Sequence, residues 1–506
     1  MSDPPGREAA VTRGEVARGA GLAGLARSAA LIEALAQPLY IWMFGLAGYG
    51  IYVVLWGAVS LLSNVLDLSM TSALQRVVPT RDDESQGAAA VRLALMITLL
   101  PTLAVALAVT LNAEAVAGLF SAAPADAARL PMLVALFVWA LPVWTFIEVA
   151  TSAARARRAF GPEIRLRIFW EQLARLGFAA LFFALGLEST GLVAAHLASL
   201  ALTAVLCMPL LSRYYGLGLL AGARGGLPLA RELILTGLAL LPANLSRRLL
   251  IDGPPLVINL ILPGARGAAA AGLFEIGRKL ATVPHIVRQA FQYVLAPLSS
   301  AQARSDRSAI RPLYHFACRV STALVVPLAG FMIFAGADIL SVYRREVAAA
   351  LPLLAILSAA RAAEAIVGPA AAIVEMTGHR ALPLLNSLIG ALLWLGLALW
   401  LTPRDGAMGM AIAVAVAVLA SSYAAAIELQ LSDALSPFDR KLVQGLAVAL
   451  VGVGAMALVE YLTGGPVRFG LNVMLWAATS WLALRFGLTR EDRVALGGLS
   501  RGLRLV

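Results

Sequence analysis

Long apolar stretches, separated by short polar segments, follow one another along almost the whole chain. The hydrocarbon core of a bilayer is about 30 Å thick and takes about 20 helical residues to cross. A helix also satisfies its own backbone hydrogen bonds inside lipid. The pattern therefore predicts an all-α, polytopic membrane protein with about 14 transmembrane helices. The predicted spans are residues 20–46, 51–75, 88–111, 131–154, 168–188, 191–212, 231–263, 268–299, 312–336, 347–376, 381–402, 407–430, 441–462 and 468–487.

Composition agrees with a membrane protein and argues against several other classes. Apolar residues make up 60% of the 506 residues and charged residues 14%, whereas soluble proteins average about 45–50% and about 25%. The segment Met1–Ala20 lacks the apolar core of a signal peptide. The two cysteines and four histidines show no metal-site spacing, and the sequence has no G-x-x-x-x-G-K-[ST] loop for ATP. We therefore expect a protein that is not an enzyme and has no catalytic residues, metal or cofactor.

Basic residues are distributed unevenly between the predicted loops. If the N-terminus is cytoplasmic, 26 of the 40 lysines and arginines lie in cytoplasmic segments or the adjoining ends of the spans, and six lie in outside loops or at their edges. Membrane proteins concentrate basic residues in their cytoplasmic loops. The net charge of +11 therefore reflects topology rather than a nucleic-acid-binding face. Both termini are predicted to be cytoplasmic, which requires an even number of spans.

A glycine-rich segment divides the predicted spans into two halves, and this composition is typical of a flexible linker. We expect a cytoplasmic N-terminal tail (1–19), an N-terminal half of six helices (20–212), a cytoplasmic linker (213–230), a C-terminal half of six helices (231–430), two further helices (431–487) and a cytoplasmic C-terminal tail (488–506).

Beyond the first turn of the seventh span, the seventh and eighth spans carry seven charged side chains. A charged group facing lipid at the centre of a helix costs about 2.5–3.5 kcal/mol, so seven would cost roughly 20 kcal/mol. These groups must therefore pair with one another or line a water-filled cavity. They are Arg247, Arg248, Asp252, Glu275, Arg278, Lys279 and Arg288.

Most polar residues of the eighth span share one face of a helix. At 100° per residue they fall within about 120°, a stripe more than four turns long. Arg288 lies outside this stripe. The stripe predicts the wall of a water-filled cavity; the alternative is packing against polar groups of other helices. Its members are Glu275, Arg278, Lys279, Thr282, His285, Gln289 and Gln292.

The seventh span contains the sequence Asp252-Gly253-Pro254-Pro255 in its middle. Two prolines remove two backbone donors and clash with the preceding turn, so we expect a kink or break there. Transporters use broken helices at their substrate sites. The alternative is a structural kink with Arg248 and Asp252 as a buried ion pair.

Several acidic residues are candidates for ion coupling. Asp67 lies on a polar stripe of the second span, without a cation within one helical turn. It is either a proton or sodium site or the partner of a cation on another helix. Glu33 in the first span raises the same question, and Asp252 and Glu275 complete the set of candidates.

Beyond the first turn of the seventh span, these two spans together have five cations and two anions, an excess that favours an anionic ligand. Arginine forms planar, bidentate hydrogen bonds that match phosphate and carboxylate groups, and it stays charged when partly desolvated. The candidate ligand-binding residues are Arg247, Arg248, Arg278 and Lys279.

Four short phrases, in order along the chain, resemble those of a known family. They are Gly48-Tyr49-Gly50, Ala271-Gly272-Leu273-Phe274 followed by Arg278-Lys279, Pro297-Leu298-Ser299, and Gly406-Ala407-Met408-Gly409-Met410-Ala411. Over residues 20–430 the chain thereby resembles the Wzx-type polysaccharide flippases of the multidrug/oligosaccharidyl-lipid/polysaccharide (MOP) exporter superfamily. The pair Pro254-Pro255 departs from the family pattern and leaves the register of the seventh span open.

The resemblance implies two six-helix lobes around a central cavity, with alternating access and two added C-terminal helices. It implies a multi-pass protein of the bacterial cytoplasmic (inner) membrane that moves an undecaprenyl-diphosphate-linked oligosaccharide from the cytoplasmic to the periplasmic leaflet. The product would be a surface polysaccharide such as O-antigen, capsule or exopolysaccharide. Arg247, Arg248, Arg278 and Lys279 would meet the diphosphate or an acidic sugar. A proton or sodium gradient would drive transport through Asp67 or Asp252, and polysaccharide polymerase machinery would be a partner.

Two other functions fit the same fold. A peptidoglycan-precursor flippase would share the helices and a cationic cavity, although the arginine motifs of that branch are absent from the first two spans. A drug or cation antiporter would use acidic cavity groups. A membrane glycan polymerase fits less well, because no large periplasmic loop is predicted.

Overall fold

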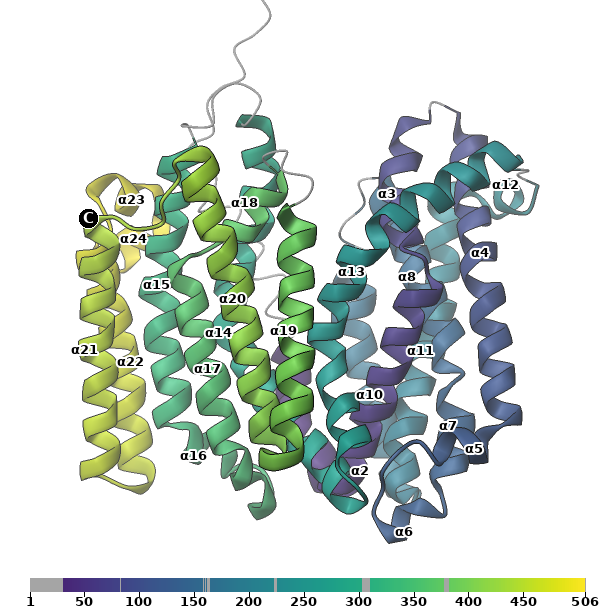
Figure 1. Ribbon diagram of the computed structural model, residues 1–506, viewed down its shortest axis with the longest axis horizontal. Helices are drawn as coiled ribbons and strands as arrows, with labels where there is room; N and C mark the ends of the chain where they lie inside the picture. Colours follow the sequence, from purple (N-terminus) through teal and green to yellow (C-terminus); the bar gives the residue numbers. More distant parts are fainter. Residues whose placement is uncertain are drawn as a thin grey trace, which may run out of the picture.

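The computed structural model describes residues 31–505, apart from 82, 158, 160, 162–163, 223–224, 303–309 and 377–381. All regular structure in the described residues is helical, which confirms the predicted all-α class. Two groups of helices stand side by side, and the last helices lie on one flank (Figure 1). The predicted N-terminal tail (1–19) lies outside the described residues.

The first group of helices, here called the N-lobe, follows the predicted spans closely. The first two predicted spans run together in α2, which breaks at Gly45 (φ 75°, ψ 164°). This positive φ is one that glycine adopts without steric cost. The helices are α2 (Leu31–Leu66), α3 (Met70–Val77), α4 (Glu84–Leu111), α5 (Ala113–Ala117), α6 (Pro124–Ala127), α7 (Leu130–Phe137), α8 (Ala140–Ala156), a π-helix (Ile164–Trp170) with α10 (Glu171–Ala184), and α11 (Glu188–Tyr215).

The second group of helices, the C-lobe, follows the short helix α12 (Leu217–Gly222). It consists of α13 (Leu227–Ile261), α14 (Ala265–Gln302), α15 (Arg311–Phe334), α16 (Gly336–Leu340), α17 (Leu351–Ile366), α18 (Ala370–Met376), α19 (Leu382–Asp405) and α20 (Ala407–Asp433). The flanking helices are α21 (Arg440–Leu462), α22 (Gly465–Gly487), α23 (Arg490–Ala495) and α24 (Gly498–Gly502). The linker helix α12 and the C-terminal helices α23 and α24 lie at the same end of the molecule (Figure 1). The predicted topology also places the linker and the C-terminal tail on one side of the membrane. That this side is cytoplasmic stays a prediction.

Of the kink or break expected at Pro254-Pro255, the break does not occur. The helix α13 is continuous over 35 residues, with both prolines buried inside it. It changes direction along its length instead (Figure 1). Proline leaves one carbonyl of the preceding turn without its helical donor, and a bend is enough to accommodate that loss. A break occurs elsewhere, because the tenth predicted span (347–376) divides at Gly368 (φ 58°) into α17 and α18.

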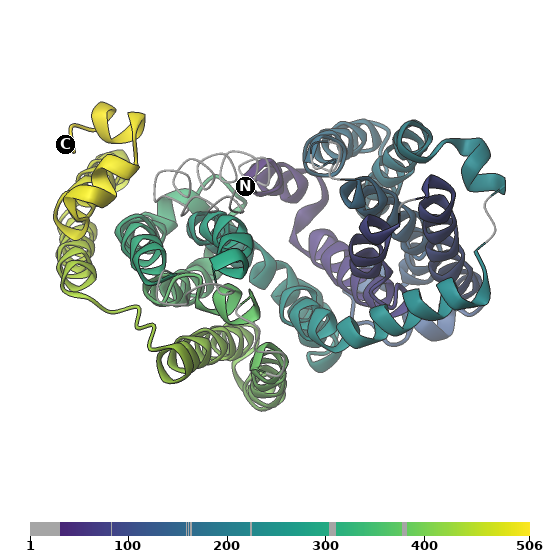
Figure 2. The same cartoon turned by 90° about the horizontal axis from the view of Figure 1, so that it is seen from above.

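The two lobes touch most closely where α2 passes α14. A Cβ atom added to Gly50 would lie 1.9 Å from the carbonyl oxygen of Ala268. Gly272 of α14 faces Leu46 and Gly50 of α2 in the same way. These glycines let the two backbones approach within a distance that any side chain would prevent. Figure 2 shows the lobes side by side when the molecule is seen from above.

Eleven helices among the described residues are long and apolar enough to cross a membrane. Three predicted spans fall outside this set: 20–46, which joins α2 and is only partly described; 168–188, which is divided by the π-helix; and 268–299, which lies in the charged α14. Large apolar side chains are exposed on the long helices, for example Leu107, Leu392 and Leu450. An apolar exterior of this kind is what lipid contact requires.

Candidate functional site

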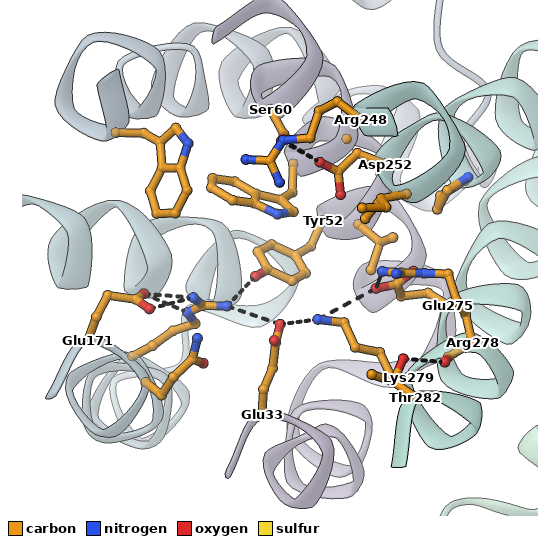
Figure 3. A pocket seen from close by; sticks show the side chains of 18 of the residues that line it. Glu33, Tyr52, Ser60, Glu171, Arg248, Asp252, Glu275, Arg278, Lys279 and Thr282 are labelled. Carbon is orange, nitrogen blue, oxygen red and sulfur yellow. Dashed lines mark hydrogen bonds and ion pairs between the residues drawn. The ribbon is translucent and has the colours of Figure 1, made fainter. Parts of the chain in front are cut away.

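A polar cavity of about 420 Å³ lies between the two lobes (Figure 3). Helices α2, α8 and α10 line it from the N-lobe, and α13 and α14 line it from the C-lobe. Cavities between helices are common ligand sites, and transporters place theirs between their repeats near the middle of the membrane. Three of the four cationic candidates from the sequence line this cavity: Arg248, Arg278 and Lys279.

A chain of ion pairs crosses the cavity from one lobe to the other. The Lys279 ammonium of α14 lies 2.5 Å from Oε1 of Glu33 on α2. The same oxygen lies 3.7 Å from the guanidinium of Arg175 on α10. Arg175 in turn donates two hydrogen bonds, of 2.7 and 2.9 Å, to the two carboxylate oxygens of Glu171. Glu33 is therefore the carboxylate that links the cations of the two lobes.

The polar stripe of α14 lines cavities, as predicted. Arg278 donates two hydrogen bonds, of 2.8 and 2.6 Å, to the carboxylate of Glu275, and Thr282 and Gln289 continue the wall. His285 and Gln292 face a second cavity inside the C-lobe. Arg288, which the helical geometry places outside the stripe, also lines that second cavity.

A second group of ion pairs surrounds Arg248 of α13. Its guanidinium lies 3.4 Å from Asp252 and 3.3 Å from Glu148 of α8. Glu148 also pairs with Arg167 at 3.1 Å, and Asp252 accepts a 2.6 Å hydrogen bond from the hydroxyl of Ser60. The Arg248–Asp252 pair, which the sequence offered as the alternative to a substrate site, is therefore present, within a network that also reaches α2 and α8.

One face of α13, which carries Asn244 and Asn259, contacts the N-lobe at two points. Asn244 donates to the hydroxyls of Ser69 and Ser72, and Asn259 donates to the carbonyl of Ser121 and accepts from its amide. Arg248 and Asp252 lie between these two contacts. This face therefore orients the charged groups of α13 toward the N-lobe.

Charge in the central network is balanced. The excess of cations on the seventh and eighth spans is offset by carboxylates that other helices supply. Each of the five basic groups lies within 3.3 Å of a glutamate carboxylate. The basic residues are Arg167, Arg175, Arg248, Arg278 and Lys279, and the acidic residues are Glu33, Glu148, Glu171, Glu275 and, as the fifth carboxylate, Asp252. Pairing of this kind keeps charged groups tolerable at membrane depth.

An aromatic wall on the N-lobe side is a feature that the sequence reasoning missed. The rings of Trp56 and Trp144 lie edge to face with centroids 5.0 Å apart, and the guanidinium of Arg167 lies 4.3 Å from the Trp144 ring. Tyr52 accepts a 2.9 Å hydrogen bond from Arg175. Tyr49, Tyr52 and Trp56 share one face of α2 at helical spacing, and this was the signal in the sequence.

Two sequence candidates lie away from the central cavity. Arg247 is exposed and lines the second cavity, in the C-lobe. Asp67 is buried beyond the end of α2 and accepts a 3.1 Å hydrogen bond from the hydroxyl of Thr71. Its other carboxylate oxygen has no hydrogen-bond partner, and no cation pairs with Asp67 among the described residues. Its role in ion coupling stays a prediction.

Comparison with solved structures identifies the fold. The chain superimposes on the lipid II flippase MurJ in an inward closed conformation with a TM-score of 0.73 and 12% identity, over 91% of this chain and 97% of that one. A MOP superfamily transporter from Pyrococcus furiosus, described as having a binding pocket of reversed polarity, gives 0.60 at 12% identity, over 83% and 96%. A mutant of the Vibrio cholerae MATE transporter VcmN gives 0.59 at 16%, over 83% and 97%.

The similarity lies in the fold rather than in the sequence. No family model matches the chain, and no curated protein matches it significantly. The neighbours are transporters and flippases, not enzymes, and they share the fold of the MOP superfamily. The chain therefore has the fold of a multi-pass MOP-type transporter.

Proposed function

We propose that this protein is a flippase that moves an undecaprenyl-diphosphate-linked oligosaccharide repeat unit across the bacterial cytoplasmic membrane for surface polysaccharide synthesis. The central cavity is the observation that carries the proposal. It offers five basic side chains, a set of carboxylates and an aromatic wall at the interface of two lobes. Cations match a diphosphate, and aromatic rings with hydroxyl and amide groups suit the faces and edges of sugars.

Binding begins when the anionic headgroup of the cargo takes the place of a carboxylate beside a basic side chain. The side chains of Arg248 and Lys279 are 26% and 21% exposed, so an anionic headgroup reaches them from the cavity. Diphosphate oxygens replace Glu33 at Lys279, and Glu33 keeps Arg175 as its partner. The link between the lobes through Glu33 is thereby broken when cargo binds. A ligand shifts a conformational equilibrium only through such a difference in contacts between states.

The return of the empty transporter uses the same groups, which pair with one another again after the cargo has left. Without cargo, Glu33 rejoins Lys279 and the lobes are linked again. A proton or sodium ion entering at Asp67, Asp252, Glu275 or Glu33 would bias this step, since each is a carboxylate inside the membrane region. Asp67 is the first choice among them, because one of its oxygens is buried without a hydrogen-bond partner.

A peptidoglycan-precursor flippase is the second candidate. Its supporting observation is the TM-score of 0.73 to MurJ over 91% of this chain. A drug or cation antiporter would instead have to use Glu33, Glu171, Asp252 or Glu275, which basic groups already occupy.

The test is a deletion strain whose polyprenyl-linked oligosaccharides are extracted and assigned to a leaflet with a membrane-impermeant glycan probe. We expect complete repeat units to accumulate on the cytoplasmic side, and the intact gene to reverse this. The mass of the accumulated glycan separates a surface polysaccharide unit from a peptidoglycan precursor. If the surface polysaccharide unit and the peptidoglycan precursor are both distributed normally between the leaflets, in a strain without a second flippase, both candidate functions are rejected.

A further inference from the structure

A cavity of about 470 Å³ lies in the N-lobe at the open end of the hairpin that α10 and α11 form, next to the linker. Its volume is in the range of small-molecule sites, about 300–1,000 Å³. Its walls are the π-helix that precedes α10 and the last turns of α11, and it shares no lining residue with the central cavity. Most of its lining residues are exposed, so this outer cavity belongs to the surface of the lobe.

Two arginines line the outer cavity without a carboxylate partner. Arg165 comes from the π-helix and Arg213 from the last turn of α11, and both are exposed. Among the residues that the structure describes, neither side chain forms a hydrogen bond or an ion pair, and the Arg213 guanidinium lies 6.0 Å from the centre of the Tyr214 ring. The other lining residues are uncharged. The outer cavity is therefore cationic, and guanidinium groups match the geometry of a phosphate.

Apolar surface continues from the outer cavity along both helices. Trp170 and Leu181, which share one face of α10 at helical spacing, are 54% and 50% exposed. Leu202 and Leu206 of α11 are 42% and 39% exposed and lie on the face that carries Arg213. Tryptophan and arginine are typical of the membrane–water interface, with their apolar parts toward the lipid. Cations at one end and an apolar surface beyond them match a phospholipid, which has a charged headgroup and acyl chains.

The π-helix connects the outer cavity to the central one. Arg165 lines the outer cavity, whereas Arg167, two residues further along, lines the central cavity. There Arg167 pairs with Glu148 at 3.1 Å and lies 4.3 Å from the centre of the Trp144 ring. π-Helical turns are rare and occur frequently at functional sites. A ligand that holds Arg165 therefore also restrains the segment that positions Arg167.

We infer that the outer cavity is a binding site for an anionic phospholipid of the leaflet beside the linker, whose phosphate contacts Arg165 and Arg213 and whose acyl chains lie along α10 and α11. Basic side chains at the membrane surface attract anionic lipids, and two of them without carboxylate partners favour an anionic lipid over a zwitterionic one. The bound lipid stabilises the π-helix and with it the position of Arg167 in the central cavity. The inference does not depend on the identity of the cargo.

The experiment measures lipid binding to the purified full-length protein in detergent by native mass spectrometry. The probes are phosphatidylglycerol, which carries one negative charge, phosphatidylcholine with the same acyl chains, and glycerol phosphate, which has no acyl chains. The test variant combines Arg165→Gln with Arg213→Gln. The control combines Arg404→Gln with Arg501→Gln and removes the same charge from two exposed arginines that do not line the outer cavity. Arg404 stacks on Trp400, and Arg501 belongs to α24.

We expect the wild-type protein and the control to bind phosphatidylglycerol about tenfold more tightly than phosphatidylcholine. The test variant should lose this preference and keep its affinity for phosphatidylcholine, because its apolar surface is intact. Equal affinity of the wild-type protein for both lipids, or a preference that survives in the test variant, overturns the inference. A preference lost equally in the control would mean that net charge selects the lipid, and it overturns the inference too. Displacement of the lipid by an equal concentration of glycerol phosphate would assign the cavity to a soluble phosphate instead.

Amide hydrogen exchange tests the link to the central cavity. We expect phosphatidylglycerol to slow exchange in the π-helix (Ile164–Trp170) of the wild-type protein and to leave it unchanged in the test variant, because a bound ligand suppresses local opening of the segment that holds it. The comparison segment is α21 (Arg440–Leu462) on the far flank of the molecule, which should not respond (Figure 1). Unchanged exchange in the π-helix of the wild-type protein with phosphatidylglycerol bound would overturn the link to Arg167.

Discussion

The charged residues of the central cavity differ in exposure, and exposure predicts whether a substitution affects ligand binding or stability. The side chains of Arg248 and Lys279 are 26% and 21% exposed, whereas those of Arg175 and Glu171 are 5% and 2% exposed. A buried pair with bidentate hydrogen bonds loses much when one partner is removed. An exposed cation whose carboxylates have other partners can be removed at little cost to folding.

Replacing Arg248 with alanine is expected to reduce transport at least about tenfold while the membrane level stays normal. Glu148 keeps Arg167, and Asp252 keeps the hydroxyl of Ser60, so neither carboxylate is left without a partner. The measurement is the leaflet distribution of the lipid-linked glycan, with Arg404→Ala as the control. Wild-type transport by Arg248→Ala would remove this residue from the site.

Replacing Arg278 with alanine is expected to act on stability instead. Glu275 is 5% exposed and would keep only Lys279, at 3.8 Å. Removing one partner of a buried pair costs about 3–5 kcal/mol. Thermal unfolding in detergent should show this loss, and the double variant Glu275→Gln with Arg278→Gln should recover most of it. A double variant as unstable as the single one would mean that the pair does not account for the loss.

At the scale of helices, charges also fix the ends of elements. Asp439 precedes α21 and accepts hydrogen bonds from the backbone amides of Lys441 and Leu442. Its carboxylate also accepts from Arg319 of α15, and Arg319 reaches Asp492 of α23 as well. This cluster therefore ties the flanking helices to the C-lobe.

The Asp439 cluster predicts a loss of stability in acid. Burial raises the pKa of Asp439, but hydrogen bonds from Arg319 and the two amides outweigh it and hold the pKa below its usual value. A depressed pKa in the folded state contributes stability above the unfolded pKa of about 4, and the contribution disappears as the pH falls through the folded pKa. Thermal unfolding below about pH 4 should therefore depend less on pH in Asp439→Asn, which keeps the helix cap. An unchanged slope would exclude Asp439 as a source of the acid sensitivity.

Helix positions were largely predictable from the sequence, because apolar length is a local property. The predicted spans 191–212, 407–430 and 441–462 correspond to α11, α20 and α21 with small shifts at their ends. The prolines alone did not decide between the two expected outcomes, a kink or a break, and α13 continues past Pro254-Pro255 without a break. The break at Gly368 was missed, because one positive φ before Pro369 leaves no trace in hydropathy.

The sequence predicted only those parts of the candidate site that lie within a single helix. Periodicity identified the stripe of α14 and the Arg248–Asp252 pair, whose members are neighbours along the chain. The partners Glu33, Glu148 and Arg175 come from other helices, and only the packing of the lobes brings them together. The charges of two helices, counted alone, therefore predicted a cationic cavity. The charges of all five helices that line the cavity cancel one another.

At the scale of the whole molecule, the glycines between α2 and α14 control how the lobes meet. Gly50→Leu places a side chain where even a Cβ atom would be 1.9 Å from the carbonyl oxygen of Ala268. We expect this variant to hold the lobes apart at this contact and to abolish transport. Distances between spin labels on the N-lobe and the C-lobe should increase at this end.

The matched control is Gly396→Leu on α19, where an added Cβ atom would meet no other atom within 4 Å. It changes the same residue type within a long apolar helix and should leave transport and the label distances unchanged. Normal transport by Gly50→Leu would mean that the lobes move without closing this contact.

The balance of five basic and five acidic side chains in the central network has an electrical consequence. Moving one unbalanced charge through the membrane potential changes the free energy by about 2.3 kcal/mol per 100 mV. The network carries no net charge when its ion pairs are intact. In the proposed cycle, reorientation of the empty transporter without a bound proton or sodium ion should therefore be insensitive to voltage, whereas the loaded step moves the charge of the cargo. When no coupling ion is bound, capacitive currents on a solid-supported membrane should then appear only with an anionic lipid-linked substrate.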